Sequence, residues 1–135
     1  MRFLKNSLLV VFFIVSGIAC STLTPKNSVV AKEEPVVIAN DSLEYEITII
    51  DPGFTTYLNS IARPRGYHSL AYLEIRNRFY VPIWNTRVNN PGLHNPAVYE
   101  NRIDYDPHVN YGYEVNYKLF NYFEFAQRKY RMVLR

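Results

Sequence analysis

The C-terminal run from Val109 to Met132 constrains the fold most, because its apolar residues fit two different periodicities. Apolar side chains alternate strictly from Val109 to Leu119, which indicates a half-buried strand. The same run also fits one face of a helix through Val115, Leu119, Tyr122, Ala126 and Tyr130. Eleven residues would be long for a strand, since most strands have about 5–6 residues. We therefore predict a helix from about Tyr113 to Met132, and a strand over 109–119 is the alternative.

Three further elements are predicted upstream of this helix. Residues 42–51 alternate between apolar and polar side chains, which predicts a strand. Asp51 can cap a helix that starts at Pro52 and runs to about Ala62.

Ser69 can cap a longer helix that continues toward Val88. Pro82 lies inside this segment and lacks a backbone N–H. It predicts either a kink near residues 78–81 or the start of a separate helix. Asn77 interrupts the apolar stripe and would need a hydrogen-bond partner if buried. Together these elements predict a mainly α fold with a minor β element: one small domain of about three helices plus one N-terminal strand.

The first 20 residues are typical of an export signal. Arg2 and Lys5 precede eight consecutive apolar residues, and the small residues Gly17 and Ala19 follow. The apolar run is shorter than the roughly 20 residues that a membrane-spanning helix needs. The chain has a single cysteine, Cys20, at the expected cleavage position.

The stretch "GIAC" at residues 17–20 resembles a bacterial lipoprotein signal. That resemblance implies cleavage before Cys20, acylation of its thiol with a diacylglyceryl group, and addition of a further chain such as palmitate. Ordinary signal cleavage after Ala19 is the alternative. Acylation would also explain an unpaired cysteine in an exported protein.

Residues 20–42 are expected to form the lipidated N-terminus and a flexible tether, because Ser, Thr, Asn and Pro are frequent there. A short apolar patch, Val36–Ile38, leaves an edge strand as the alternative for that part of the tether. Residues 1–19 would then be the signal peptide and residues 43–135 the globular domain. The residue after the cysteine is Ser21, which is compatible with the outer membrane. The sequence "KEE" at residues 32–34 lies too far from Cys20 to match a signal for export to the cell surface. We therefore expect the periplasmic face of the outer membrane.

The charge balance argues against a nucleic-acid partner. Arg2 and Lys5 leave with the signal, so the 15 basic residues fall to 13 against 12 acidic ones, a net charge of about +1. No basic run remains that could form the electrostatic footprint of a nucleic-acid binder. All 12 Tyr residues belong to the mature chain. Such rings mostly pack cores, and some of them can form an aromatic surface for a sugar or a protein partner.

Two groups of side chains are candidate binding sites. The loop "RPRGYH" offers Arg63, Arg65 and His68 for an acidic partner or an anion, and Trp84 is a further candidate contact. A solvated turn is the alternative for the loop.

The stretch "DYDPH" has Asp104, Asp106 and His108 at alternate positions, so an extended backbone would place them on one side. Carboxylates and an imidazole form a known metal-ligand set. Turn-capping acids and a solvated histidine are the alternative. No G-x-S-x-G, H-E-x-x-H or Gly-rich phosphate loop occurs, so we predict no catalytic residue and no cofactor.

Five short motifs in combination resemble a small uncharacterised lipoprotein family of the Bacteroidetes: "IIDPGF", "RPRGYHS", "YLEIRNRFYV", "RIDYDP" and "YGYEVNYKLFNYF". The resemblance covers about residues 44–131. It implies an exported lipoprotein with a mostly helical domain, and it supplies no catalytic residue.

The sequence therefore favours a membrane-tethered, non-catalytic interaction or structural module of the cell envelope. Its expected partners are the membrane, through the lipid, and an envelope protein or glycan. The alternative function is a small ligand-binding or metal-dependent domain centred on Asp104, Asp106 and His108.

Overall fold

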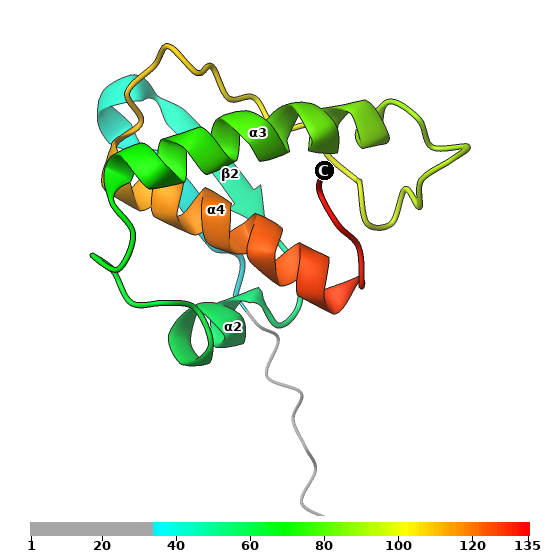
Figure 1. Ribbon diagram of the computed structural model, residues 1–135, viewed down its shortest axis with the longest axis horizontal. Helices are drawn as coiled ribbons and strands as arrows, with labels where there is room; N and C mark the ends of the chain where they lie inside the picture. The colour runs from blue at the N-terminus through cyan, green and yellow to red at the C-terminus, as the bar shows by residue number, and fades with distance from the viewer. Residues whose placement is uncertain (1–33) are drawn as a thin grey trace, which may run out of the picture. The chain divides into compact units, whose positions relative to one another are not determined.

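The computed structural model describes residues 34–135, which lie within one compact unit (Figure 1). The elements follow in the order β1 (Val36–Asn40), η1 (Asp41–Leu43), β2 (Tyr45–Ile49), α2 (Phe54–Ser60), α3 (Leu70–Val88) and α4 (Gly112–Lys129). Helices dominate, and the two strands form one small antiparallel sheet. The predicted fold class, mainly α with a minor β element, is confirmed. Within the described residues no helix is both long and apolar enough to cross a membrane.

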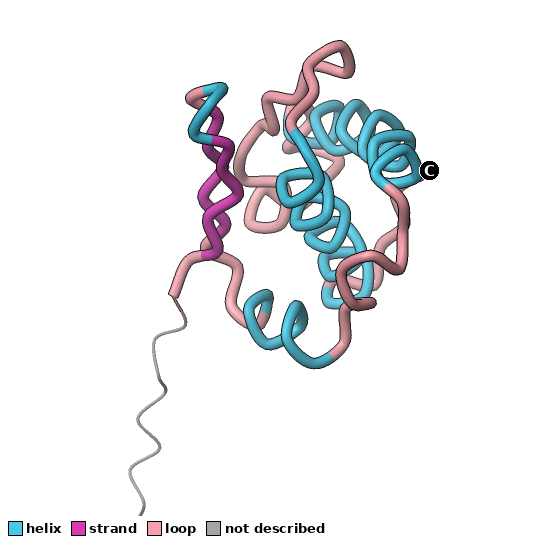
Figure 2. The backbone as a smooth tube through the Cα atoms, turned by 90° about the vertical axis from the view of Figure 1, so that its left-hand side faces the viewer, coloured by secondary structure: helices cyan, strands magenta, loops and turns pink. Residues whose placement is uncertain are grey.

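The two strands form a hairpin that lies on one side of the helices (Figure 2). Residues 36–40 were expected to belong to the tether, and the structure instead shows β1 there, the alternative that the sequence left open. The strand forms because β2 supplies its antiparallel partner and because Ile38 becomes fully buried. Two side chains also connect β1 to the N-terminal part of α4. Asn40 Nδ2 donates to Tyr111 O at 3.0 Å, and Lys118 Nζ donates to Val37 O at 2.9 Å.

β2 is shorter than the predicted strand over residues 42–51. The preceding residues turn instead, because Glu44 adopts a left-handed backbone conformation with φ of 49°. The inward-facing pattern nevertheless holds where the strand forms, since Ile49 is buried and Ile47 packs against the core.

α2 begins two residues later than predicted and has a different N-cap. Gly53, with φ of 96°, is the cap, and no side chain caps the helix. Asp51 is unavailable as a cap because its carboxylate accepts hydrogen bonds from Lys129 Nζ at 2.5 Å and from Tyr130 Oη at 2.8 Å. Asp51 was expected to cap α2. It instead connects the turn before α2 to the C-terminal end of α4.

α3 is a single helix that continues through Pro82. Ser69 caps it as predicted, because its hydroxyl accepts from Tyr72 N at 3.2 Å. Proline deprives the carbonyl of Arg78 of its helical hydrogen bond. Pro82 and Arg78 are both exposed, so water can satisfy that carbonyl, and neither the predicted kink nor a separate helix is required.

α4 confirms the predicted C-terminal helix and excludes the alternative strand over 109–119. Figure 1 shows α4 between α3 and α2, and β1 also packs against it. Ten of its residues are buried: Val115, Asn116, Tyr117, Leu119, Phe120, Asn121, Tyr122, Phe123, Phe125 and Ala126. The buried residues lie all round the helix, so large apolar side chains also occur at alternate positions. Its sequence therefore satisfies a strand periodicity by accident.

Buried asparagine side chains connect the elements where backbone groups would otherwise lack partners. Asn77, fully buried on α3, donates from Nδ2 to Asn116 O and Oδ1, both at 3.0 Å. Asn85 makes a reciprocal pair with the backbone of Ile103: Nδ2 donates to the carbonyl and Oδ1 accepts from the N–H, each at 2.8 Å. The predicted need of Asn77 for a partner is thus met at Nδ2, whereas its buried Oδ1 has no hydrogen-bond partner within the described residues.

Replacement of Asn85 tests this arrangement. Asn85→Ala leaves the buried N–H and carbonyl of Ile103 without partners, so we expect the free energy of unfolding to fall by about 2 to 4 kcal/mol. Urea unfolding followed by circular dichroism measures the loss. Asn59→Ala, at an exposed position of α2, is the matched control and should change stability by about 0.5 kcal/mol or less. An Asn85→Ala midpoint equal to that of the wild type would contradict a structural role for the pair.

Candidate functional site

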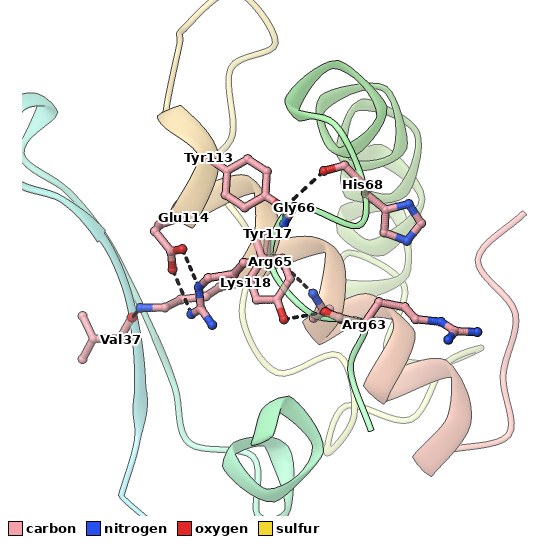
Figure 3. Close-up of polar contacts among 10 residues, drawn as sticks. Val37, Arg63, Arg65, Gly66, His68, Tyr113, Glu114, Tyr117 and Lys118 are labelled. Atoms are coloured by element: carbon pink, nitrogen blue, oxygen red, sulfur yellow. Dashed lines mark hydrogen bonds and ion pairs between the residues drawn. The ribbon is translucent and has the colours of Figure 1, made fainter. Parts of the chain in front are cut away.

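Side chains of α4 hold the loop that contains Arg63, Arg65 and His68. The guanidinium of Arg65 makes two bonds to the carboxylate of Glu114, at 2.6 and 3.0 Å (Figure 3). The hydroxyl of Tyr113 accepts from Gly66 N at 2.7 Å and donates to His68 O at 3.2 Å. Gly66 has φ of 86°, a conformation that other residues rarely adopt. The loop is therefore fixed in one conformation at the N-terminal end of α4.

Arg65 helps to hold this loop. Its guanidinium also lies 4.7 Å from the centroid of the Tyr117 ring, whose hydroxyl donates to Arg63 O at 2.8 Å. The hydrogen bond from Arg65 lowers the pKa of Glu114, so this carboxylate stays ionised at neutral pH. Both charged side chains are about half exposed, so their pairing contributes at most about 1 kcal/mol to stability. Its main effect is on the position of the loop.

Arg63 and His68 extend outward from the same loop. Figure 3 shows the Arg63 side chain pointing away from the Arg65–Glu114 pair. Its guanidinium lies 5.0 Å from the centroid of the Tyr67 ring, a cation–π arrangement. In the part of the chain that the structure describes, no carboxylate lies within ion-pair distance of Arg63. Its charge is consequently available to a partner.

An exposed aromatic surface continues from this loop along α3. We define it by Tyr67, His68, Tyr72, Ile75 and Phe79. The ring of His68 lies edge-on to Tyr67 at 4.7 Å and stacks on Tyr72 at 4.4 Å with an interplanar angle of 9°. Ile75 and Phe79 continue the surface one and two turns farther along the helix. Tyr72, Ile75 and Phe79 are 41%, 64% and 49% exposed.

This surface makes α3 apolar on both sides. Its inner side buries Leu73, Tyr80 and Trp84 against α4 and the loops. The described residues leave the outer side of α3 uncovered, so this side is the strongest candidate contact surface.

Trp84 is not part of the exposed surface. It is only 2% exposed, its Nε1 donates to Asn101 O at 3.0 Å, and its ring packs edge-on against Tyr99 and Tyr122. The expectation that Trp84 contacts a partner is corrected on this ground: the large ring fills the core. Tyr72, Ile75 and Phe79 were not singled out from the sequence. Their spacing of three and four residues, parallel to the buried stripe, was the signal that could have indicated them.

Asp104, Asp106 and His108 do not form a metal-binding group. His108 Nδ1 lies 3.0 Å from Asp106 Oδ1, and the N–H of His108 donates to the same oxygen at 2.8 Å. These bonds lower the pKa of Asp106. All three residues are exposed, and residues 34–135 contain no group of three His, Cys, Asp or Glu side chains that could hold a metal ion. Asp106 acts as a turn-capping residue.

A pocket of about 320 Å³ lies between β2 with its following turn and the segment 97–103. Trp84, Tyr122 and Tyr130 line it together with charged residues that include Glu100 and Arg102. Burial, followed by the nearby charge of Asp51, raises the pKa of Tyr122, so this hydroxyl stays neutral. A pocket of aromatic rings and a few polar groups can hold a small molecule. It does not include Asp104, Asp106 or His108, around which the ligand-binding alternative was centred.

Tyr113 should control the mobility of the loop. Tyr113→Phe removes two hydrogen bonds that together contribute about 1.4 kcal/mol, so local opening becomes about tenfold more frequent. Trypsin can cut after Arg65, whereas Arg63 precedes proline and resists cutting. We expect about tenfold faster cleavage between Arg65 and Gly66, measured by mass spectrometry. Tyr67→Phe, in the same loop and 59% exposed, should cleave at the wild-type rate. Equal rates for Tyr113→Phe and wild type would show that α4 does not hold the loop.

Comparisons with known proteins bear out the resemblance in its coarser part, that the chain matches an uncharacterised family. Neither the comparison with curated proteins nor the comparison with solved structures gave a match. A comparison with protein families matched residues 6–135 to a family of unknown function, DUF6146. Since the match spans nearly the whole chain, this protein belongs to the DUF6146 family.

Proposed function

We propose that the protein is a lipid-anchored, non-catalytic interaction module of the bacterial cell envelope, which binds a partner protein through the aromatic surface of α3. The observation that carries this proposal is the exposure of Tyr72, Ile75 and Phe79 on one face of the same helix, α3. Three large apolar side chains on one helical face are costly to leave in water. Their retention is explained when a second surface covers them.

The composition of the surface favours a protein partner. Aromatic and arginine side chains dominate the energetic centres of protein interfaces. The aromatic surface has rings at both ends, and Arg63 extends its loop end with a free charge. On α3 itself, Ile75, Phe79 and the neighbouring exposed Pro82 offer aliphatic and aromatic contacts, which suit a protein partner.

The lipid anchor is the second part of the proposal. Cys20 lies outside the described residues, so its support comes from the sequence: a charged start, an apolar run, and a single cysteine at the cleavage position. Two or three acyl chains hold a protein on a membrane, since each buried CH₂ contributes about 0.8 kcal/mol. We place the anchored module at the periplasmic face of the outer membrane, in reach of other envelope proteins.

The anchor is tested on protein isolated from its native membrane. We expect a mature chain that begins at Cys20 and carries the added mass of a diacylglyceryl group, measured by intact mass spectrometry. Cys20→Ala should lack this mass and move to the soluble periplasmic fraction, whereas Ser21→Ala should remain in the membrane. A native chain that starts at Cys20 without added hydrocarbon mass would refute lipidation.

The interaction is tested in intact cells with a photoreactive amino acid at position 75. We expect a reproducible cross-linked adduct on irradiation, and we expect its loss when Phe79→Ser removes a neighbouring ring. The control places the same photoreactive group at Leu93, which is 84% exposed and lies in the loop after α3. That position should give no adduct. If the chain with the photoreactive group at position 75 stayed monomeric under every irradiation condition, the proposed contact surface would be contradicted.

A further inference from the structure

The outward face of α3 has an internal symmetry in its residue types. Successive residues of a helix are rotated by about 100°. Relative to Ile75 at the centre of the exposed face, Tyr72 and Phe79 therefore lie on one flank, and Glu74 and Arg78 lie on the other. One flank is aromatic and the other carries one charge of each sign.

The midpoints of the two flanks lie about half a residue apart along the helix. The midpoint between Tyr72 and Phe79 falls between Ile75 and Arg76, and the midpoint between Glu74 and Arg78 falls at Arg76. Ile75 itself lies within one residue of both midpoints. A rotation of 180° about an axis through this region, perpendicular to the helix, exchanges the members of each pair.

We propose that the partner of this surface is a second copy of the chain, whose α3 packs antiparallel on the first around that two-fold axis. In this arrangement Ile75 meets Ile75 of the second copy at the centre. Tyr72 packs on Phe79 of the second copy, and Glu74 pairs with Arg78, each twice by symmetry. The inference rests on the proposed function, because it names the partner for the same surface.

Charge complementarity selects the antiparallel arrangement. A two-fold axis perpendicular to the helices brings like flanks together, so rings face rings and Glu74 faces Arg78. In a parallel pair the two-fold axis runs along the helices and brings opposite flanks together. The ring of Phe79 would then face charged side chains. The resulting contact is isologous, as in every two-fold symmetric dimer, the commonest form of homo-oligomer.

The available groups support this pairing. Arg78 is exposed and Glu74 is partly exposed, and neither belongs to an ion pair within residues 34–135. On the opposite flank Arg76 is already engaged, since its guanidinium lies 4.5 Å from the centroid of the Tyr80 ring and donates to the Tyr80 hydroxyl. Arg76 is thus held beside its own helix and does not add a competing charge to the aromatic flank.

The contact is small, so the association should be weak in solution. The face from Tyr72 to Pro82 covers three turns of helix, about 16 Å, which corresponds to the low end of interface sizes. Anchoring on a membrane raises the effective concentration of two copies and compensates for weak affinity. The experiment therefore uses the full chain in its own membrane.

The test introduces a cysteine at the predicted axis. Apart from Cys20, the chain contains no other cysteine. We expect Ile75→Cys to form a disulfide-linked dimer when intact cells are oxidised. The matched control, Leu93→Cys, is more exposed but distant from the proposed axis, and it should remain monomeric. A control that cross-links as efficiently as Ile75→Cys would show random collision and would overturn the proposal.

Charge reversal in the Ile75→Cys background tests the register. Glu74→Arg and Arg78→Glu each place like charges together twice per dimer, so each should lower the cross-linked fraction about tenfold. The double reversal restores opposite charges and should restore the dimer. Unchanged unfolding midpoints for these surface variants would show that the fold is intact.

The outcomes separate this inference from the proposed function. Absence of the Ile75→Cys dimer, or failure of the double reversal to restore it, overturns self-association. If position 75 then still gives a photo-adduct with a different protein, the interaction function stands with another partner. If neither cross-link forms, both proposals fail.

Discussion

The burial of α4 on nearly all sides is the constraint on which the rest of the structure depends. α3, α2 and β1 each pack against it. The ring centroid of Phe123, near the middle of α4, lies 5.4 to 6.2 Å from the ring centroids of Tyr80, Trp84 and Tyr122. A domain of this size has a modest core. Large rings compensate, because each buries about 150–250 Å².

Polar side chains of α4 also connect this largely buried helix to the neighbouring loops by hydrogen bonds. They are tyrosine, asparagine and glutamate side chains that reach past the core. Tyr113, Glu114 and Tyr117 hold the loop before α3, and Asn116 accepts from Tyr105 Oη at 2.8 Å and so holds the segment before α4. Long segments without regular structure are consequently ordered by side chains, and their outward residues keep defined positions.

The sequence predicted the elements whose signals are local. Ser69 capped α3 as expected, because an N-cap depends on hydrogen bonds within one turn. β1 was uncertain because a five-residue strand depends on a partner strand and on a buried site for Ile38, and neither is visible locally. Asp51 has the chemistry of a cap, but a distant lysine and tyrosine bind it. Trp84 was named as a candidate contact because residue type alone cannot distinguish a ring that fills a core from one that binds a partner.

The same reasoning explains why the contact surface was found only in part. The sequence identified Arg63 and His68 as candidates because they are polar residues in a turn. Ile75 and Phe79 resemble ordinary core residues of a helix. Only the packing of α3 on α4 divides its apolar residues into an inner and an outer set. The outer set is also the set with paired flanks around Ile75. Core packing requires no such pairing, because inner residues meet a different helix, whereas self-association requires it. The symmetry of the outer face is therefore an argument for a function distinct from stability.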